Sequence, residues 1–258
     1  MNFDKLDSGY WIRQIARVED LQTRIRERED ALANGRVIPD GTDLALGAGR
    51  RLPMAVMFID ICGFSQRRVE SFDEQHAMLV ALNLFFTEMI RIATDYGGTV
   101  EKNTGDGLMA YFEEKADLPR EGGAKRAVAC ALTMMAANQH LITPALHGRG
   151  FEPFSFRVSV DYGYVTIANL GVARRFNSYA AIGATANFAA KMLGKAKAGE
   201  IVIGQSVRSR LPIEWQNAYT VEHPEATGWS FIGPDGRHLP YLLFKYTGAW
   251  RLWPDLSI

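Results

Sequence analysis

The sequence predicts an α+β fold in which strands and helices alternate along a chain of 258 residues, long enough for one domain with a sizeable core. Residues 54–61, MAVMFIDI, form a short and almost wholly apolar run, which is typical of a buried strand. Residues 73–96 then carry apolar side chains at helical spacing and are followed by Gly97 and Gly98, which commonly end a helix. Because such patterns alternate along the chain, we expect a sheet covered by helices.

The later elements continue this alternation. Residues 99–102 and 108–112 predict two strands of a hairpin, and the glycines at 105 and 107 permit a tight turn between them. The other expected elements are a helix at 120–140, a strand at 155–162, a strand followed by a helix at 183–193, and a strand at 200–203 followed by a short helical piece.

An amphipathic helix is predicted ahead of this domain, because apolar residues recur at three- and four-residue steps within the charged segment 8–33. Such a helix is suited to docking or dimerisation. We therefore divide the chain into an N-terminal helix and linker, residues 1–51, and a main domain, residues 52–258, whose part beyond about 215 carries no clear signature. The aromatic residues of this tail are expected to close a core or a dimer surface: Trp229, Tyr241, Trp250 and Trp253.

Composition argues against several classes of function. The chain has 29 basic and 29 acidic residues, so its formal net charge is 0, which argues against a nucleic-acid or basic membrane-binding surface. Its most apolar stretch, residues 78–92, is interrupted by polar residues, so we expect no membrane span and no signal peptide. The two cysteines and five histidines lack metal-ligand spacing, and free thiols suit a reducing cytoplasm.

Two aspartates are the sharpest local features. Asp60 lies near the end of the first predicted strand, where an unpaired carboxylate is costly unless a cation or hydrogen-bond donors satisfy it. Asp106 lies in the turn of the predicted hairpin, and two aspartates at the ends of adjacent strands can share a divalent ion. Other roles stay open, because Asp60 could cap a helix beginning near Phe64 and Asp106 could be only a turn residue.

The segments around these aspartates resemble the motifs of class III nucleotidyl cyclases. Residues 58–65, FIDICGFS, look like the FxDIxGFT signature, and residues 101–110, EKNTGDGLMA, resemble the EKxxGDxxMA hairpin. The block 158–170 and the segment IGATAN at 182–187 are also similar to the family. The resemblance covers about residues 52–212 and does not include the N-terminal helix.

The resemblance implies a ferredoxin-like catalytic domain, with an antiparallel-rich sheet, that acts as a head-to-tail homodimer with shared active sites. One subunit would bind two Mn²⁺ or Mg²⁺ ions through Asp60, Asp106 and the backbone carbonyl of Ile61. The 3′-hydroxyl of a nucleoside triphosphate would then attack the α-phosphorus, and pyrophosphate would leave.

The partner subunit would supply the remaining groups, and one of them departs from the family. Asn187 matches the transition-state asparagine of the family, whereas Lys191 stands where the family has arginine. Lysine keeps the positive charge but lacks the bidentate hydrogen bonding of a guanidinium. Residues spaced i and i+4 share a helix face, as joint action would require. Further candidates for contacts to the substrate are Phe64, Arg174, Arg175 and Arg237.

The base pocket is the second departure. Lys102 occupies the first base-reading position, but the second is Ala180, which offers no acceptor for an exocyclic amino group. Lysine has donors only, so it suits a carbonyl oxygen, and uracil presents carbonyls and no amino group.

We therefore predict a uridylate cyclase that resembles the bacterial pyrimidine cyclases of antiphage systems, whose cyclic product activates a separate effector. The alternatives are a cytidylate cyclase, an adenylate cyclase with a non-standard pocket, and a catalytically silent nucleotide-binding domain.

Overall fold

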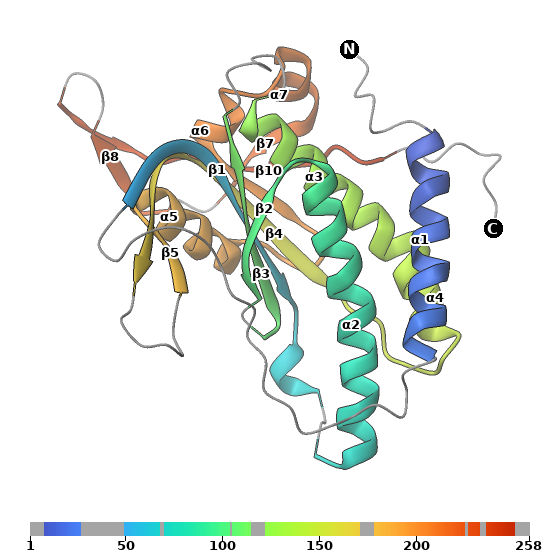
Figure 1. Cartoon of the computed structure of the whole chain (residues 1–258). Coiled ribbons are helices and arrows are strands. Elements are labelled where there is room, and N and C mark those ends of the chain that lie inside the picture. Colours follow the sequence, from blue (N-terminus) through green and yellow to red (C-terminus); the bar gives the residue numbers. More distant parts are fainter. Residues whose placement is uncertain are drawn as a thin grey trace.

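The computed structural model describes residues 8–26, 49–67, 70–103, 105–114, 122–170, 178–224, 227–232 and 236–250. The main sheet has the strand order β2-β3-β1-β4-β6-β10-β7, with β5 paired to β4, and β8 and β9 form a separate two-stranded sheet. All pairs are antiparallel except β4 and β6. Figure 1 shows α1 to α4 on one side of this sheet and α5 on the other. The expected α+β architecture with an antiparallel-rich sheet is confirmed.

The strands are β1 (Gly49–Ile61), β2 (Thr99–Asn103), β3 (Gly107–Glu113), β4 (Phe156–Leu170), β5 (Ser178–Ile182), β6 (Ile201–Gly204), β7 (Thr220–Glu222), β8 (Ser230–Ile232), β9 (His238–Pro240) and β10 (Leu243–Tyr246). The α-helices are α1 (Ser8–Arg26), α2 (Phe72–Asp95), α3 (Gly123–Ala137), α4 (Thr143–His147), α5 (Ala184–Met192), α6 (Gln205–Arg208) and α7 (Ile213–Tyr219). The helix predicted for 120–140 thus continues further, through a π-helix at Asn138–Ile142 into α4.

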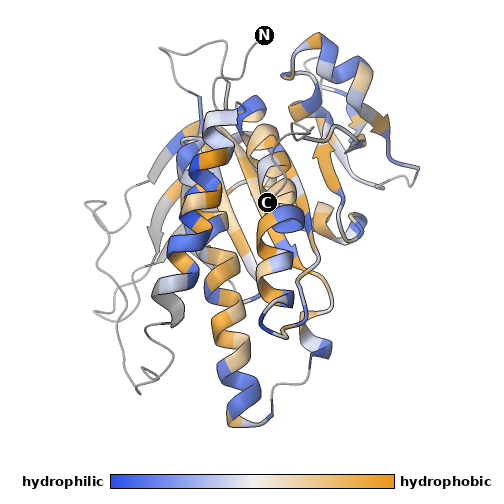
Figure 2. Cartoon of the chain, turned by 90° about the vertical axis from the view of Figure 1, so that its right-hand side faces the viewer, coloured by the Kyte–Doolittle hydropathy of each residue, from blue (hydrophilic) through white to orange (hydrophobic). Residues whose placement is uncertain are grey.

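Helix α2 begins where local chemistry dictates. Ser71 and Glu74 form a capping box in which each side chain accepts a hydrogen bond from the other residue's backbone N–H. By length and composition α2 would also qualify as a membrane span. Its inner residues, among them Phe85 and Met89, are instead fully buried in the core. Figure 2 shows that its hydrophobic middle gives way to a hydrophilic N-terminal end.

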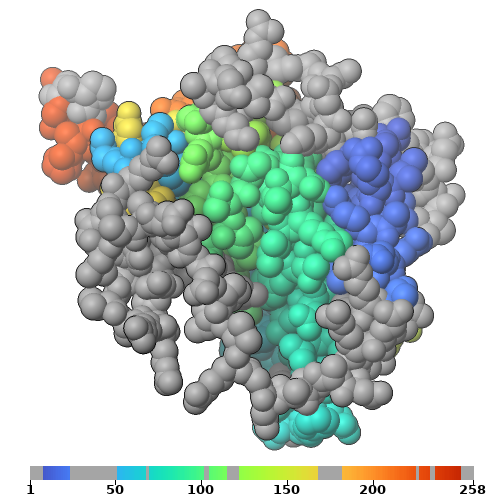
Figure 3. All heavy atoms as spheres, in the orientation of Figure 1, coloured from blue at the N-terminus to red at the C-terminus, as the bar shows by residue number. Residues whose placement is uncertain are grey.

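The predicted N-terminal helix exists, and it packs on its own chain. Its buried residues include Trp11 and Val18, and Arg17 forms ion pairs with the buried Glu88 at 3.1 Å and with Asp95 at 2.5 Å. Figure 3 shows α1 lying beside α2 at the surface. The inner face of α1 is therefore occupied by α2, while the domain boundary at residue 51 stays a prediction.

The tail contributes more structure than the sequence indicated. Strand β10 inserts between β6 and β7 of the main sheet, and β8 and β9 form a hairpin. The expectation that the tail aromatics close a core is confirmed where they are described: Tyr241 is buried, Trp229 stacks on Phe188, and Trp250 lies against Trp11. Residue 253 lies outside the described part of the chain.

One buried acid links the tail to the sheet and makes stability depend on pH. Asp161 of β4 is 1% exposed and accepts a hydrogen bond from the Tyr241 hydroxyl. Burial raises the pKa of Asp161 from its ordinary value of 3.8 to about 7. Between these values the folded chain holds a proton that the unfolded chain has released. The contribution of Asp161 is therefore fully present at low pH and is lost as the pH rises toward 7.

We expect Asp161→Asn to remove this dependence. Relative to the variant, the wild type should lose up to about 4 kcal/mol of unfolding free energy between pH 4 and 7, since each pKa unit is worth about 1.4 kcal/mol. Urea denaturation across this range measures the difference, and the exposed Asp73→Asn is the matched control that should keep the wild-type profile. Parallel profiles for the wild type and Asp161→Asn would contradict the assignment.

Candidate active site

Strand β1 places Asp60 on the face of the sheet that carries α5. Successive side chains of a strand point to opposite faces. Met57 and Ile59 belong to the core beneath the long helices, whereas Met54 and Val56 pack in a second cluster with residues of α5. Asp60 follows the alternation of Met54 and Val56, so its carboxylate lies on the α5 face, near the end of the strand.

Asp106 lies directly beside Asp60. The register pairs Asp60 with Gly107, and the backbone N–H of Ile61 donates to the carbonyl oxygen of Asp106 at 2.9 Å. The Asp106 side chain is half-buried, and its carboxylate has no hydrogen bond or ion pair within the described residues. The β1–β3 pairing thus brings the two aspartates to adjacent positions, as the sequence predicted, while their role as metal ligands stays a prediction.

Sequence reasoning missed Arg157, which is the partner of Asp60. The β1–β4 register places the two residues opposite each other, and the Nε and Nη2 atoms of Arg157 lie 2.8 and 2.6 Å from Oδ2 of Asp60. The only sequence signal was an arginine at the start of an alternating strand. The ion pair depends on a register between distant segments, which local periodicity does not encode.

The donor set fits a hard divalent cation. Both bonds from Arg157 go to Oδ2, so Oδ1 of Asp60 is left without a protein partner in the described structure. Two carboxylates and the Ile61 carbonyl are oxygen ligands of the kind that Mg²⁺ and Mn²⁺ prefer. Burial raises the pKa of the neighbouring Cys62 thiol, so a thiolate ligand is not expected.

The part of the chain that the structure describes does not supply a full set of side-chain ligands for an ion. The described residues contain no group of three or more His, Cys, Asp or Glu side chains that could hold a metal. An ion held by Asp60 and Asp106 would therefore take further oxygens from water or a ligand. Mg²⁺ commonly binds in this way, through one or two carboxylates together with phosphate oxygens.

Helix α5 carries the predicted transition-state residues on its outer side. Its inner side is fixed to β4, because the hydroxyl of Ser159 donates to the carbonyl oxygen of Ala189 at 2.6 Å. Asn187 and Lys191 are exposed, one helical turn apart. The Lys191 ammonium lies 6.0 Å from the ring centre of Trp229. Both side chains are therefore open to a ligand or to a second copy.

The other predicted site residues lie on separate elements. Lys102 pairs with Met109 between β2 and β3, and Ala180 of β5 pairs with Ala168. Phe64 is half-buried and packs against the main core. The remaining candidates are Arg237, which is exposed at the end of the β8–β9 connection, and Arg174 and Arg175, which lie outside the described residues.

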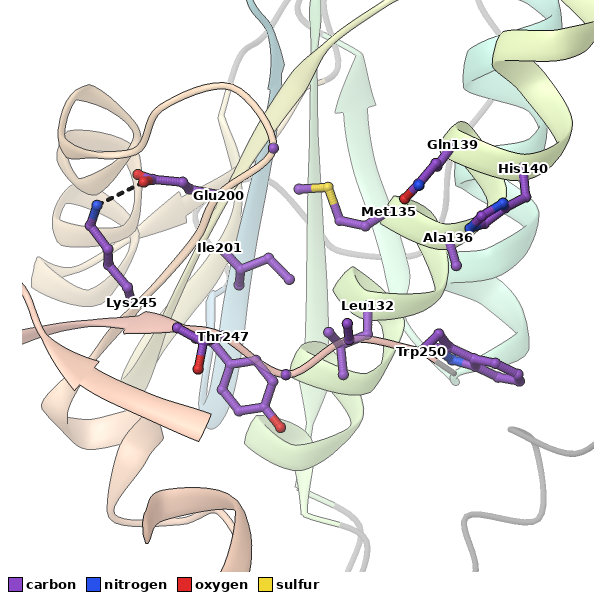
Figure 4. A pocket seen from close by; sticks show the side chains of 14 residues that line it. Leu132, Met135, Ala136, Gln139, His140, Glu200, Ile201, Lys245, Thr247 and Trp250 are labelled. Atoms are coloured by element: carbon purple, nitrogen blue, oxygen red, sulfur yellow. Dashed lines mark hydrogen bonds and ion pairs between the residues drawn. The ribbon is translucent and has the colours of Figure 1, made fainter. Parts of the chain in front are cut away.

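The described structure does have a pocket, but away from these residues. A cavity of about 350 Å³ lies between the end of α3, the π-helix and the segment after β10. Figure 4 shows Met135, His140 and Trp250 around it, and the Lys245–Glu200 ion pair at another edge. None of the predicted site residues lines this cavity. The paired aspartates thus lie outside this cavity.

Comparisons with known proteins agree with this geometry. The sequence model of the adenylate and guanylate cyclase catalytic domain matches residues 48–231. An uncharacterized protein of Mycobacterium tuberculosis is 30% identical over 228 residues, which are 88% of this chain and 35% of the relative. The chain thus spans about a third of the length of that relative.

Solved structures give the same picture. The adenylyl cyclase CyaB from P. aeruginosa is similar with a TM-score of 0.62 and 25% identity, over 81% of this chain and 100% of that chain. The guanylyl cyclase Cya2 is similar with a TM-score of 0.60 and 22% identity, over 81% of this chain and 97% of that chain. Because proteins named for different bases match almost equally well, the fold does not discriminate between bases.

Proposed function

Because the chain belongs to the adenylate and guanylate cyclase catalytic domain family, we propose that this nucleotide cyclase domain converts UTP to 3′,5′-cyclic UMP and pyrophosphate. The observation that carries the cyclase chemistry is the pairing of β1 with β3, which brings Asp60 and Asp106 to adjacent positions at one end of these strands. The choice of UTP rests on Lys102 and Ala180.

The protein groups at this end of the strands have separate tasks. Asp60, Asp106 and the Ile61 carbonyl would hold two Mn²⁺ or Mg²⁺ ions. When bound, such ions make the 3′-hydroxyl more acidic and neutralise charge on the phosphates. Arg157 fixes the orientation of the Asp60 carboxylate through two hydrogen bonds and places a cation where phosphate oxygens would approach.

The second half of the site would come from another copy of the chain. Within one chain, Ala180 lies on β5 and Asn187 on α5, whereas the paired aspartates lie at β1 and just before β3. Lys102 lies on β2, which pairs with β3. We propose a head-to-tail homodimer in which Asn187 and Lys191 of one copy orient the ribose and the triphosphate held by the other. Pre-positioning of this kind supplies much of the catalysis in phosphoryl transfer.

Base selection follows from what the pocket residues can and cannot bond. Lys102 can donate to a carbonyl oxygen of uracil, and Ala180 offers no acceptor. Adenine and cytosine each carry an amino group that would lose its hydrogen bond on entering such a pocket, at a cost of about 1–3 kcal/mol. UTP is therefore favoured over CTP and ATP.

A second candidate is an adenylate cyclase with a non-standard base pocket. It is favoured by the 25% identity to CyaB, which is named as an adenylyl cyclase. The third alternative, a silent nucleotide-binding domain, is disfavoured because Asp60, Asp106 and Asn187 are all present.

The experiment is a competition among ATP, GTP, CTP and UTP at equal concentration with Mn²⁺, read by mass spectrometry of the cyclic products. We expect cyclic UMP to exceed each other product by about tenfold, the value of one unpaired buried polar group. Ala180→Asp, which restores an acceptor, should shift the products toward cyclic AMP. Cyclic AMP alone from the wild type would overturn the pyrimidine choice, and no product with any nucleotide would favour the silent domain.

We further propose that the cyclic product acts in the cytoplasm as a second messenger for a separate effector in antiphage defence. The support is the resemblance to pyrimidine cyclases, together with the formal charge of 0, which argues against nucleic-acid binding. Cyclic UMP that fails to rise in infected cells would exclude this role.

A further inference from the structure

We propose that Trp229 is a positioning residue that orients the Lys191 ammonium for the phosphates, in place of the rigid fork of an arginine. The inference rests on the proposed role of α5 in the cyclase reaction. Figure 1 shows β8, which follows Trp229, on the same side of the main sheet as α5. Three stacked aromatic rings, those of Tyr241, Phe188 and Trp229, lead from the sheet to the Lys191 ammonium.

The stack is anchored in the sheet. Tyr241 donates a hydrogen bond from its hydroxyl to the buried Asp161 of β4, and its backbone N–H donates to the carbonyl oxygen of Trp229 at 2.9 Å. A Cβ at Gly204 would clash with Asp161 Oδ1 and with the Tyr241 hydroxyl, so there is no room for a side chain at this position. The Tyr241 ring is therefore held in one place.

The next two rings stack in turn on Tyr241 and extend the stack toward the surface. Phe188 of α5 stacks on Tyr241 at 5.0 Å and 24°, and Trp229 stacks on the same Phe188 at 5.5 Å and 13°. Offset-stacked rings at these separations attract each other beyond the effect of simple burial. The Trp229 ring is thus held in a fixed position beside the outer side of α5.

The Lys191 ammonium lies beside the Trp229 ring. Its Nζ is 6.0 Å from the Trp229 ring centre, at the limit of a cation–π contact, and Lys191 follows Phe188 by three positions on the same helix. A lysine has a flexible stem and no planar fork, so an exposed ammonium would otherwise sample many positions. Contact with Trp229 restricts the positions that the Lys191 ammonium can adopt, on the helix face that also carries Asn187.

A packing role for Trp229 makes different predictions from a positioning role. If Trp229 acts through Lys191, Trp229→Ala should lower kcat by about two- to fivefold, the range of an exposed cation–π contact, with little change in KM. Trp229→Phe should retain most of the activity, because it keeps an aromatic face. In a Lys191→Ala background, Trp229→Ala should have no further effect on kcat.

The matched control is Phe231→Ala. Phe231 lies on the same hairpin and contacts the edge of Tyr241 at 6.0 Å, but the structure gives it no contact with Lys191. Its loss should destabilise the tail to a similar degree, yet its effect on kcat should add to that of Lys191→Ala. Independent, additive effects of Trp229→Ala and Lys191→Ala would overturn the proposal.

A measurement without turnover separates this inference from the proposed function. Lysines are reductively methylated with ¹³C, which keeps their charge, and the Lys191 signal is assigned by its disappearance in Lys191→Arg. We expect a ring-current shift of this signal that is lost in Trp229→Ala and kept in Trp229→Phe and Phe231→Ala. An unshifted or unchanged signal would overturn the positioning role, even if the wild type makes cyclic UMP. Absence of product with a normal ring-current shift would instead count against the cyclase assignment.

Discussion

Replacement of Asp106 by asparagine is expected to lower cyclic nucleotide formation at least about 100-fold, with the fold intact. Bound divalent ions stabilise the transition state by several kcal/mol, and about 1.4 kcal/mol is worth a factor of ten in rate. The amide keeps the shape of the carboxylate but loses the charge that would hold the cation. The measurements are product formation at saturating UTP and its dependence on Mn²⁺ concentration.

Asp106 is a cleaner test than Asp60. The Asp106 carboxylate has no hydrogen bond or ion pair within the described residues, so its replacement by asparagine breaks none of these interactions. Asp60→Asn would also weaken the bonds to Arg157, which are 2.8 and 2.6 Å long. A loss of activity in that variant would therefore mix metal binding with the position of a guanidinium.

The control for charge is Asp73→Asn, which removes one carboxylate from the exposed first turn of α2. It should leave turnover and the Mn²⁺ dependence unchanged. If Asp106→Asn keeps full activity with the same Mn²⁺ dependence, the paired aspartates do not hold the catalytic ions, and the proposed mechanism is wrong.

The core of the fold could be read from local pattern. The apolar run that became β1 and the helical spacing that became α2 are signals within one segment, and Ser71 with Glu74 even marks the start of the helix. Asp60 and Asp106 were recognised because each lies beside such a segment. Asp60 and Asp106 become neighbours through the short β2–β3 hairpin and the pairing of β1 with β3.

The missed features depend on contacts between distant segments. Strand β10 spans only Leu243–Tyr246, too short for a periodic signal, and it finds its place between β6 and β7. The ion pair of Arg157 with Asp60 depends on the β1–β4 register. The contact of Lys191 with Trp229 requires the tail hairpin to fold back beside α5. None of these is encoded in a local window of sequence.

The division of the site between two copies leads to the second large effect. Asp106→Asn and Asn187→Ala should each be inactive as homodimers, yet a mixture of the two should recover activity. In a mixed dimer one site carries both substitutions and the other carries neither. With equal amounts and free exchange, half of the dimers are mixed and each has one intact site, so recovery should reach about a quarter of the wild-type rate.

This recovery distinguishes a shared site from one built within a single chain. Asn187 is exposed on α5, so its truncation leaves the packing of that helix on β4 unchanged. A mixture of Asp106→Asn with Asp60→Asn is the matched control, because both substitutions fall in the same half of the site and each mixed dimer then lacks an intact one. Recovery in the first mixture alone requires that Asp106 and Asn187 act across an interface. Equal absence of activity in both mixtures would mean that one chain carries the whole site, and α5 would then have to reach its own aspartates.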